Sequence, residues 1–170
     1  GMAQALGVRF FAGDTQDTLI SMAGLAQIGK VPRIDMSAVD KRLNSLRIIG
    51  LTDVKSPACG RNGAIYVFAG QKGLPDKYFS KYDDAMHSFL SVWDATVCDT
   101  LGSGAAGALG AGLLALCDAE LTSGAREIAK LCGIESSLKD SDLLVTGEGH
   151  IDSQSLQGKV IFGLGELARK

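Results

Sequence analysis

Hydrophobic positions along the chain alternate between short apolar runs, which are typical of strands, and longer segments with helical spacing. The apolar runs predict strands at residues 8–11, 31–35, 46–51 and 142–145, the last two as buried strands. Helical spacing predicts helices at residues 18–27, 38–43, 75–97, 105–117, 125–132 and 160–170. Ser37 is the expected N-cap of the second of these helices, and Gly133 is expected to end the fifth. The alternation of strands and helices predicts the α/β fold class.

The clearest helix begins at Pro75, a residue that is favoured at the first helical position. Its apolar residues recur every three or four positions, at Tyr78, Tyr82, Met86, Phe89, Trp93 and Val97. A continuous stripe of this kind is typical of a helix that packs on the core, and we expect core packing here rather than an aromatic ligand site.

The two ends of the chain both have helical patterns that are incomplete. Residues 1–7 resemble the last turns of a helix that Gly7 stops, and they lack a start signal. Residues 160–170 keep helical spacing up to the last residue. We therefore expect the chain to be a piece of a longer protein.

Composition narrows the function classes. With 170 residues and 46% hydrophobic content, the chain is expected to fold as one domain, or as one domain with part of another. A net charge of -2 and a pI near 5.6 do not indicate the basic surface that nucleic-acid-binding domains usually have. The apolar stretch 105–117 is too short to span a membrane, and no signal peptide is recognisable, so a cytoplasmic protein is expected.

Cysteine spacing argues against a structural metal. The four cysteines form no CxxC pair, and neither histidine is placed to complete a zinc site; these residues are Cys59, Cys98, Cys117, Cys132, His87 and His150. We expect four reduced thiols, most of them buried.

The segment 146–159, TGEGHIDSQSLQGK, is the strongest candidate for an active-site turn. It follows a predicted strand and precedes a predicted helix, and open α/β sheets bind ligands where such strands end. Gly147 and Gly149 let the backbone approach a ligand, while Glu148 and Asp152 can hold a metal ion or take a proton. The alternative is an ordinary solvent-facing loop with two acids, and a single loop histidine such as His150 is usually exposed.

A second glycine-rich segment, 102–107, has the spacing GxGxxG but follows a long helix instead of a strand. The dinucleotide-binding interpretation therefore fails. Free N–H groups at Ser103 and Gly104, where the next helix begins, could still bind a phosphate or carboxylate. The alternative is close packing at Gly104, Gly107 and Gly110, and both can hold together.

Two further side chains are candidates. Asp53 ends a predicted strand and could take a hydroxyl proton or help to position a metal, although it could instead cap its own loop. Lys72 could place an ammonium group over an anion, although most lysines are simply solvated.

Three segments together resemble the bacterial glycerate kinase family. They are LTDVKSPACGRNGAIYVFAGQKG (51–73), GSGAAGALGAGLLAL (102–116) and DLLVTGEGHIDSQSLQGK (142–159). The GEG-x-x-D-x-Q-[ST]-x-x-GK run is the most specific of these matches, and residues 1–11 also resemble a family segment. His150 stands where the family often has arginine.

The resemblance implies a fold of two α/β domains, in which the second is inserted into the first and the active site lies in the cleft between them. On that basis residues 1–7 end a helix of the first domain. Residues 8–140 form the inserted, mixed-sheet domain, and residues 141–170 return as a strand, turn and helix to the first domain.

The same resemblance implies transfer of the γ-phosphoryl group of ATP, with Mg²⁺, to a hydroxyl of D-glycerate, giving 2-phosphoglycerate. Asp53 would orient or deprotonate the hydroxyl, and Glu148 or Asp152 would hold Mg²⁺. Anionic groups of the substrates would meet Lys72, Ser103, Gly104, Gly147 and Gly149. Two alternatives stay open, namely an enzyme for another hydroxy acid and a non-catalytic binding or assembly domain. The segment alone is expected to be inactive and could form homo-oligomers through exposed apolar faces.

Overall fold

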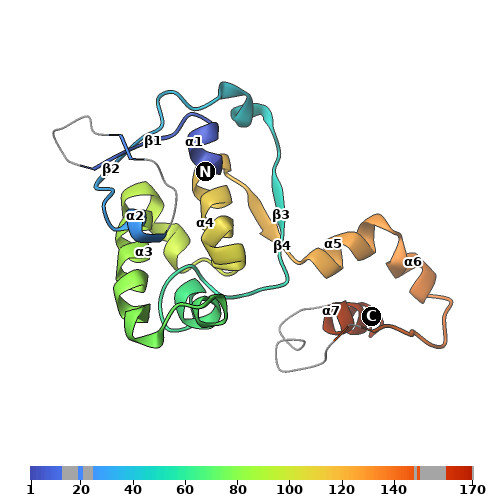
Figure 1. Ribbon diagram of the computed structural model, residues 1–170. Helices are drawn as coiled ribbons and strands as arrows, with labels where there is room; N and C mark the ends of the chain where they lie inside the picture. Colours follow the sequence, from blue (N-terminus) through green and yellow to red (C-terminus); the bar gives the residue numbers. More distant parts are fainter. Residues whose placement is uncertain (13–18, 21–24, 148, 150–159, 170) are drawn as a thin grey trace.

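The computed structural model describes residues 1–12, 19–20, 25–147, 149 and 160–169 (Figure 1). Most helices and both sheets form one body, and α5, α6 and α7 form a C-terminal limb that stands apart from it. The α-helices are α1 (Met2–Ala5), α2 (Leu25–Ile28), α3 (Phe79–Asp94), α4 (Ala105–Cys117), α5 (Gly124–Leu131), α6 (Ile134–Leu138) and α7 (Val160–Leu167). The strands are β1 (Arg9–Phe11), β2 (Arg33–Asp35), β3 (Ile49–Leu51) and β4 (Glu120–Thr122). Short 3-10 or π segments are η1 (Lys41–Ser45), η2 (Ile65–Ala69), η3 (Gly70–Lys72), η4 (Asp76–Tyr78) and η5 (Ala95–Cys98).

The strands form two separate two-stranded sheets. Strands β1 and β2 are antiparallel, with Phe10 opposite Ile34, whereas β3 and β4 are parallel, with Gly50 opposite Leu121. The mixed α/β class is thus confirmed, and the inserted-domain arrangement stays a prediction. Strand β3 is shorter and more exposed than expected for 46–51, because among the described strands it pairs with β4 alone.

The main core forms around α3. As predicted, Met86, Phe89 and Val97 of its apolar stripe are buried. The ring of Phe10 on β1 lies 5.7 Å from the ring of Phe89 and 5.9 Å from that of Trp93. These contacts join the antiparallel sheet to α3 and confirm core packing of the stripe from Tyr82 onward, whereas Tyr78 is exposed.

Helix α1 ends where the sequence predicts. Gly7 has φ 101°, and a Cβ atom there would lie 2.1 Å from the carbonyl oxygen of Ala38. A side chain at this position would therefore be strained and would clash with the backbone. Glycine is required for α1 to turn into β1.

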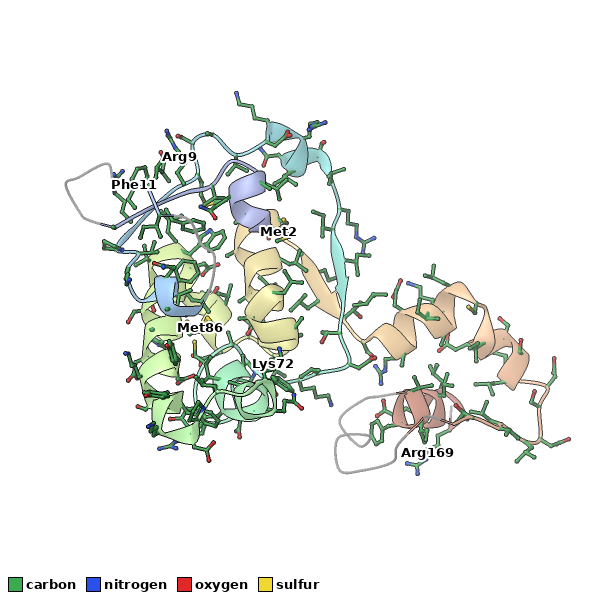
Figure 2. The ribbon with its side chains drawn as sticks, in the orientation of Figure 1. Met2, Arg9, Phe11, Lys72, Met86 and Arg169 are labelled. Atoms are coloured by element: carbon green, nitrogen blue, oxygen red, sulfur yellow. The ribbon has the colours of Figure 1, made fainter. Side chains whose placement is uncertain are left out.

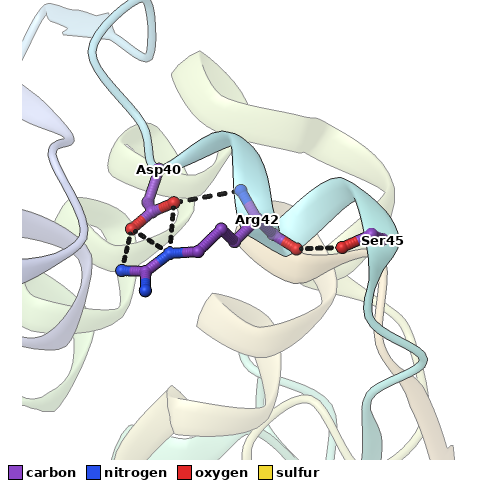
Figure 3. A network of polar contacts seen from close by, with 3 residues as sticks. All are labelled: Asp40, Arg42 and Ser45. Carbon is purple, nitrogen blue, oxygen red and sulfur yellow. Dashed lines mark hydrogen bonds and ion pairs between the residues drawn. The ribbon is translucent and has the colours of Figure 1, made fainter.

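The predicted helix at 38–43, with Ser37 as its N-cap, is wrong. The short helix η1 begins three residues later, because Asp40 accepts hydrogen bonds from both the backbone N–H and the guanidinium of Arg42 (Figure 3). The N–H of Ser37 instead donates to the carboxylate of Asp35 at 2.8 Å. The prediction at 18–27 is met in part by α2, since Leu19 forms a bridge with Phe11 and residues 21–24 lie outside the described part of the chain.

Helix α4 has the predicted bounds but an irregular first turn. Ala106, Gly107 and Ala108 all have positive φ, at 53°, 74° and 67°. Left-handed geometry is costly for alanine, so two residues here are strained.

The C-terminal limb begins at Ser123, whose hydroxyl accepts a hydrogen bond from the N–H of Arg126. Gly133, with φ 68°, ends α5 as predicted, and α7 lies within the predicted helix 160–170. An ion pair between Arg126 and Glu166 links α5 to α7. No helix in the part of the chain that the structure describes is both long and apolar enough to cross a membrane.

The predicted buried strand at 142–145 is wrong. Leu143 is 78% exposed and Val145 is 83% exposed, and the segment has no regular secondary structure. A buried parallel strand needs neighbouring strands and covering helices, and none of the described elements supplies them here.

Three cysteines are buried and one is exposed. Cys59, Cys98 and Cys117 lie in the core, Cys132 is exposed, and all four are free thiols. Burial raises the pKa of the Cys59 thiol far above its ordinary value, and neighbouring Cys98 raises it further. The prediction of reduced, mostly buried thiols is confirmed.

Candidate functional site

The parallel strands β3 and β4 end at the same edge, and a pocket lies at that edge. The backbone N–H of Thr52 donates to the carbonyl of Thr122 at 2.9 Å, so the two chains leave the sheet side by side. The pocket has a volume of about 210 Å³. Its lining residues come from three segments and are Thr52, Asp53, Val54, Lys55, Leu101, Gly102, Leu121, Thr122 and Ser123. We call it the Asp53 pocket.

Asp53 lies between the pocket and the N-terminus of α5. Its carboxylate accepts a hydrogen bond of 3.3 Å from the backbone N–H of Ala125. A Cβ atom on Gly124 would lie 3.2 Å from the same carboxylate oxygen, so glycine permits this close approach. Asp53 therefore does not cap its own loop; the hydroxyl of Thr52 does so by accepting from the N–H of Val54 at 3.1 Å.

Three polar residues of this pocket, Thr52, Lys55 and Ser123, were not predicted as site residues from the sequence. Lys55 follows Asp53 by two residues, and this closeness in sequence could have indicated that both side chains belong to one site. Ser123 follows β4, a strand of three residues that is too short to produce an alternating pattern.

The turn around Ser103 packs tightly against the loop that follows Asp53. The N–H groups of Ser103 and Gly104 donate to the carbonyls of Thr100, at 3.1 Å, and Ser56, at 3.0 Å. The expectation that these two N–H groups are free for an anion is therefore wrong. A Cβ atom on Gly104 would lie 2.1 Å from the carbonyl oxygen of Pro57, and one on Gly110 would lie 2.5 Å from that of Gly102. These distances confirm close packing at these two glycines but not at Gly107.

Lys72 lies at a different pocket, of about 380 Å³, which we call the Lys72 pocket. It is lined by Lys72 and by apolar residues or glycines, namely Ala64, Ile65, Phe68, Ala69, Gly73, Leu74, Met86 and Gly107. Figure 2 shows Lys72 between η2 and the N-terminal end of α4. A Cβ atom on Gly107 would lie 3.8 Å from the Lys72 ammonium nitrogen. The structure thus places Lys72 and Asp53 in separate pockets.

The turn 146–159 is described only in part. Gly147 and Gly149 are exposed, and Glu148, His150 and Asp152 lie outside the described residues. Within the described ranges, no group of three or more His, Cys, Asp and Glu side chains could hold a metal ion.

A sequence model of the glycerate kinase family matches residues 1–170, the whole chain. The chain belongs to the glycerate kinase family. Among its relatives in this family, Glycerate 2-kinase of Escherichia coli (strain K12) is 36% identical and Glycerate kinase of Haemophilus influenzae is 34% identical. Each match includes 100% of this chain and 45% of the relative. The glycerate kinase segment described here therefore spans less than half the length of these relatives.

The fold agrees with a crystal structure of the same family. A protein described as a glycerate kinase 2 from Salmonella typhimurium LT2 superposes with a TM-score of 0.80 and 38% sequence identity. The match covers 99% of this chain and 46% of the other. The similarity supports the fold across almost the whole glycerate kinase segment.

Proposed function

We propose that the chain is part of an ATP-dependent glycerate kinase, which transfers the γ-phosphoryl group of ATP to a hydroxyl of D-glycerate and gives 2-phosphoglycerate. The observation that carries the proposal is the position of Asp53, in a pocket at the carboxyl edge of two parallel strands in a member of this family. Open α/β folds bind substrates at such edges. The name of the Escherichia coli relative, Glycerate 2-kinase, supports the choice of product.

Asp53 is the proposed acceptor of the hydroxyl proton. The N–H of Ala125 holds its carboxylate in place at the pocket, where it can accept the proton of a substrate hydroxyl. Lys55, at the same pocket, has an ammonium group suited to the carboxylate of glycerate. A pocket of about 210 Å³ with these polar groups suits a three-carbon hydroxy acid.

Mg²⁺ is the metal that phosphoryl transfer from ATP requires, and it neutralises charge on the phosphates. Protein sites for Mg²⁺ often supply one or two carboxylates and leave the other ligands to phosphate and water. Asp53 is the one carboxylate among the described residues that line its pocket, and it is assigned to the hydroxyl proton. Glu148 and Asp152, the acids of the most specific family run, are the proposed Mg²⁺ ligands.

The remaining proposed roles concern the turns around the site. Ser103 and Gly104 would hold the loop after Asp53 in place, since the Ser103 hydroxyl accepts from the N–H of Ala58 and the N–H of Gly104 donates to the carbonyl of Ser56. Exposed Gly147 and Gly149 would let the backbone approach a phosphate. Because the reaction consumes ATP, we place the enzyme in the cytoplasm.

The test uses the full-length protein that carries this chain. Incubation with ATP, Mg²⁺ and D-glycerate should give 2-phosphoglycerate, identified by ³¹P NMR against both phosphoglycerate standards. L-Glycerate, lactate and glycolate serve as competing hydroxy acids. Faster turnover of another acid, or hydrolysis of ATP without transfer, would overturn the proposal. Residues 1–170 alone should give no turnover, because their relatives use more than twice this length.

A further inference from the structure

A kinase must bind two ligands of different chemistry, and two pockets of different chemistry flank the turn 102–107. Gly102 lines the Asp53 pocket, and Gly107 lines the Lys72 pocket. The turn is held rigidly, because the carbonyl of Ser103 accepts from the N–H of Ala111 at 2.8 Å and that of Gly102 accepts from Ala105 at 3.0 Å.

The Lys72 pocket is unsuited to glycerate. Eight of its nine lining residues are apolar or glycine. A glycerate molecule there would leave its two hydroxyls among side chains that cannot accept or donate hydrogen bonds, which is costly. The Asp53 pocket has hydroxyl, carboxylate and ammonium groups that can pair with the hydroxyls of glycerate, so this cost does not arise there.

The same lining suits a flat, largely apolar ring that carries a polyanion. Phe68 and Met86 offer an aromatic and a polarisable surface for ring packing. Lys72 is exposed and supplies one positive charge beside Gly107. The volume of about 380 Å³ is within the usual range for ligand pockets, roughly 300–1,000 Å³.

We propose that the Lys72 pocket binds the base of the nucleoside triphosphate and that Lys72 contacts the phosphates of this nucleotide. The turn 102–107 would then separate the base from the hydroxy acid in the Asp53 pocket. This assignment rests on the proposed function. It gives Lys72 to the nucleotide and leaves Asp53 and Lys55 to glycerate.

Two variants of the full-length protein test the assignment. Ala69→Phe fills the pocket with a larger side chain, and Lys72→Ala removes the charge from an exposed position where folding is not at risk. Lys81→Ala, on the exposed surface of α3, is the matched control for lost charge. Calorimetry with ADP and with inorganic tripolyphosphate, together with KM values for ATP and D-glycerate, gives the readout.

If the inference is correct, Ala69→Phe weakens ADP binding and leaves tripolyphosphate binding unchanged. Lys72→Ala weakens both roughly tenfold, the loss expected for one charged hydrogen bond. The KM for D-glycerate and the Lys81→Ala control stay at wild-type values. A rise in the KM for D-glycerate instead, or unchanged ADP binding in both variants, would overturn the assignment while glycerate phosphorylation still stands. Should the wild type bind ADP with these variant effects but fail to phosphorylate glycerate, the pocket assignment survives and the proposed function does not.

Discussion

The side-chain hydroxyl of Ser103 accepts a hydrogen bond of 2.7 Å from the backbone N–H of Ala58, and both residues are fully buried. The N–H of Cys59 also donates to the carbonyl of Cys98, at 3.1 Å. These bonds hold the loop after Asp53 against the turn that begins α4. The position of the proposed catalytic carboxylate therefore depends on a buried serine that lines neither pocket.

Replacing Ser103 with alanine should destabilise the protein by about 1–3 kcal/mol, because the N–H of Ala58 would be buried without a partner. Urea unfolding of the variant measures the change in the free energy of unfolding. Ser88→Ala, on the exposed face of α3, is the control and should change stability by no more than about 0.5 kcal/mol. Equal effects in the two variants would show that the buried hydrogen bond contributes nothing.

Asp53→Asn should lower the turnover number of the full-length enzyme at least about a hundredfold, as expected for loss of a general base. Asparagine keeps an oxygen that can accept from the N–H of Ala125, so the folded structure should be retained. Steady-state kinetics measures the turnover number, and circular dichroism checks that the variant is folded. Asp84→Asn, an exposed acid on α3, is the control. Wild-type turnover in Asp53→Asn would remove Asp53 from the catalytic role.

Ala106→Gly should stabilise the protein by about 0.5–1 kcal/mol. Ala106 is exposed and has φ 53°, and glycine adopts this left-handed geometry without the cost that alanine carries. Ala115→Gly, in the regular part of α4, should instead destabilise by about 1 kcal/mol. Thermal unfolding of both variants gives the comparison, and a loss of stability in Ala106→Gly would contradict it.

The Asp40 carboxyl should titrate near pH 2. Side-chain and backbone hydrogen bonds from Arg42 lower its pKa from the ordinary 3.8 to about 2. Because the folded-state pKa is depressed, the contribution to stability is complete above about pH 4 and is lost as the pH falls toward 2. ¹³C-detected NMR titration measures the value. Arg42→Ala keeps the backbone N–H, so the pKa should rise only part of the way toward 3.8, and an unchanged pKa would show that the guanidinium is not its cause.

Cys132 should react with iodoacetamide well before the other three cysteines. It is exposed, whereas Cys59, Cys98 and Cys117 are buried, and burial raises the pKa of both Cys59 and Cys117. Peptide mass spectrometry after timed labelling identifies the modified thiols. The contrast should vanish in urea, and early labelling of Cys59 in the folded protein would contradict the buried core described above.

The elements predicted best were those whose signals are local and repeated. The stripe of α3 and the ends of α1 and α5 at Gly7 and Gly133 depend on residues close in sequence, and the structure confirms them. The segment 142–145 has an equally strong apolar pattern, but a buried strand needs partners that its own residues cannot specify. Strand β4 could not be predicted from the sequence, because it has only three residues and its partner β3 lies some seventy positions earlier in the chain.

The candidate site was predicted in the same uneven way. Asp53 was found because it directly follows a strand, and its contact with the N-terminus of α5 could not be inferred, since it joins residues 72 positions apart. The glycines at 102–107 suggested both binding and packing, and local sequence could not tell that Ser56 and Thr100 would use the N–H groups. Glu148 and Asp152 stay predictions.

The single residue Ser123 separates β4 from α5, and α5 begins the limb that stands apart from the main body (Figure 1). The same end of α5 carries the N–H that holds the Asp53 carboxylate. A rotation of the limb about Ser123 would pull that donor away from the acid. The orientation of the limb and the position of the Asp53 carboxylate are therefore coupled. A partner that binds α7 and turns the limb would also move the hydrogen-bond donor of Asp53, since α5 joins the two.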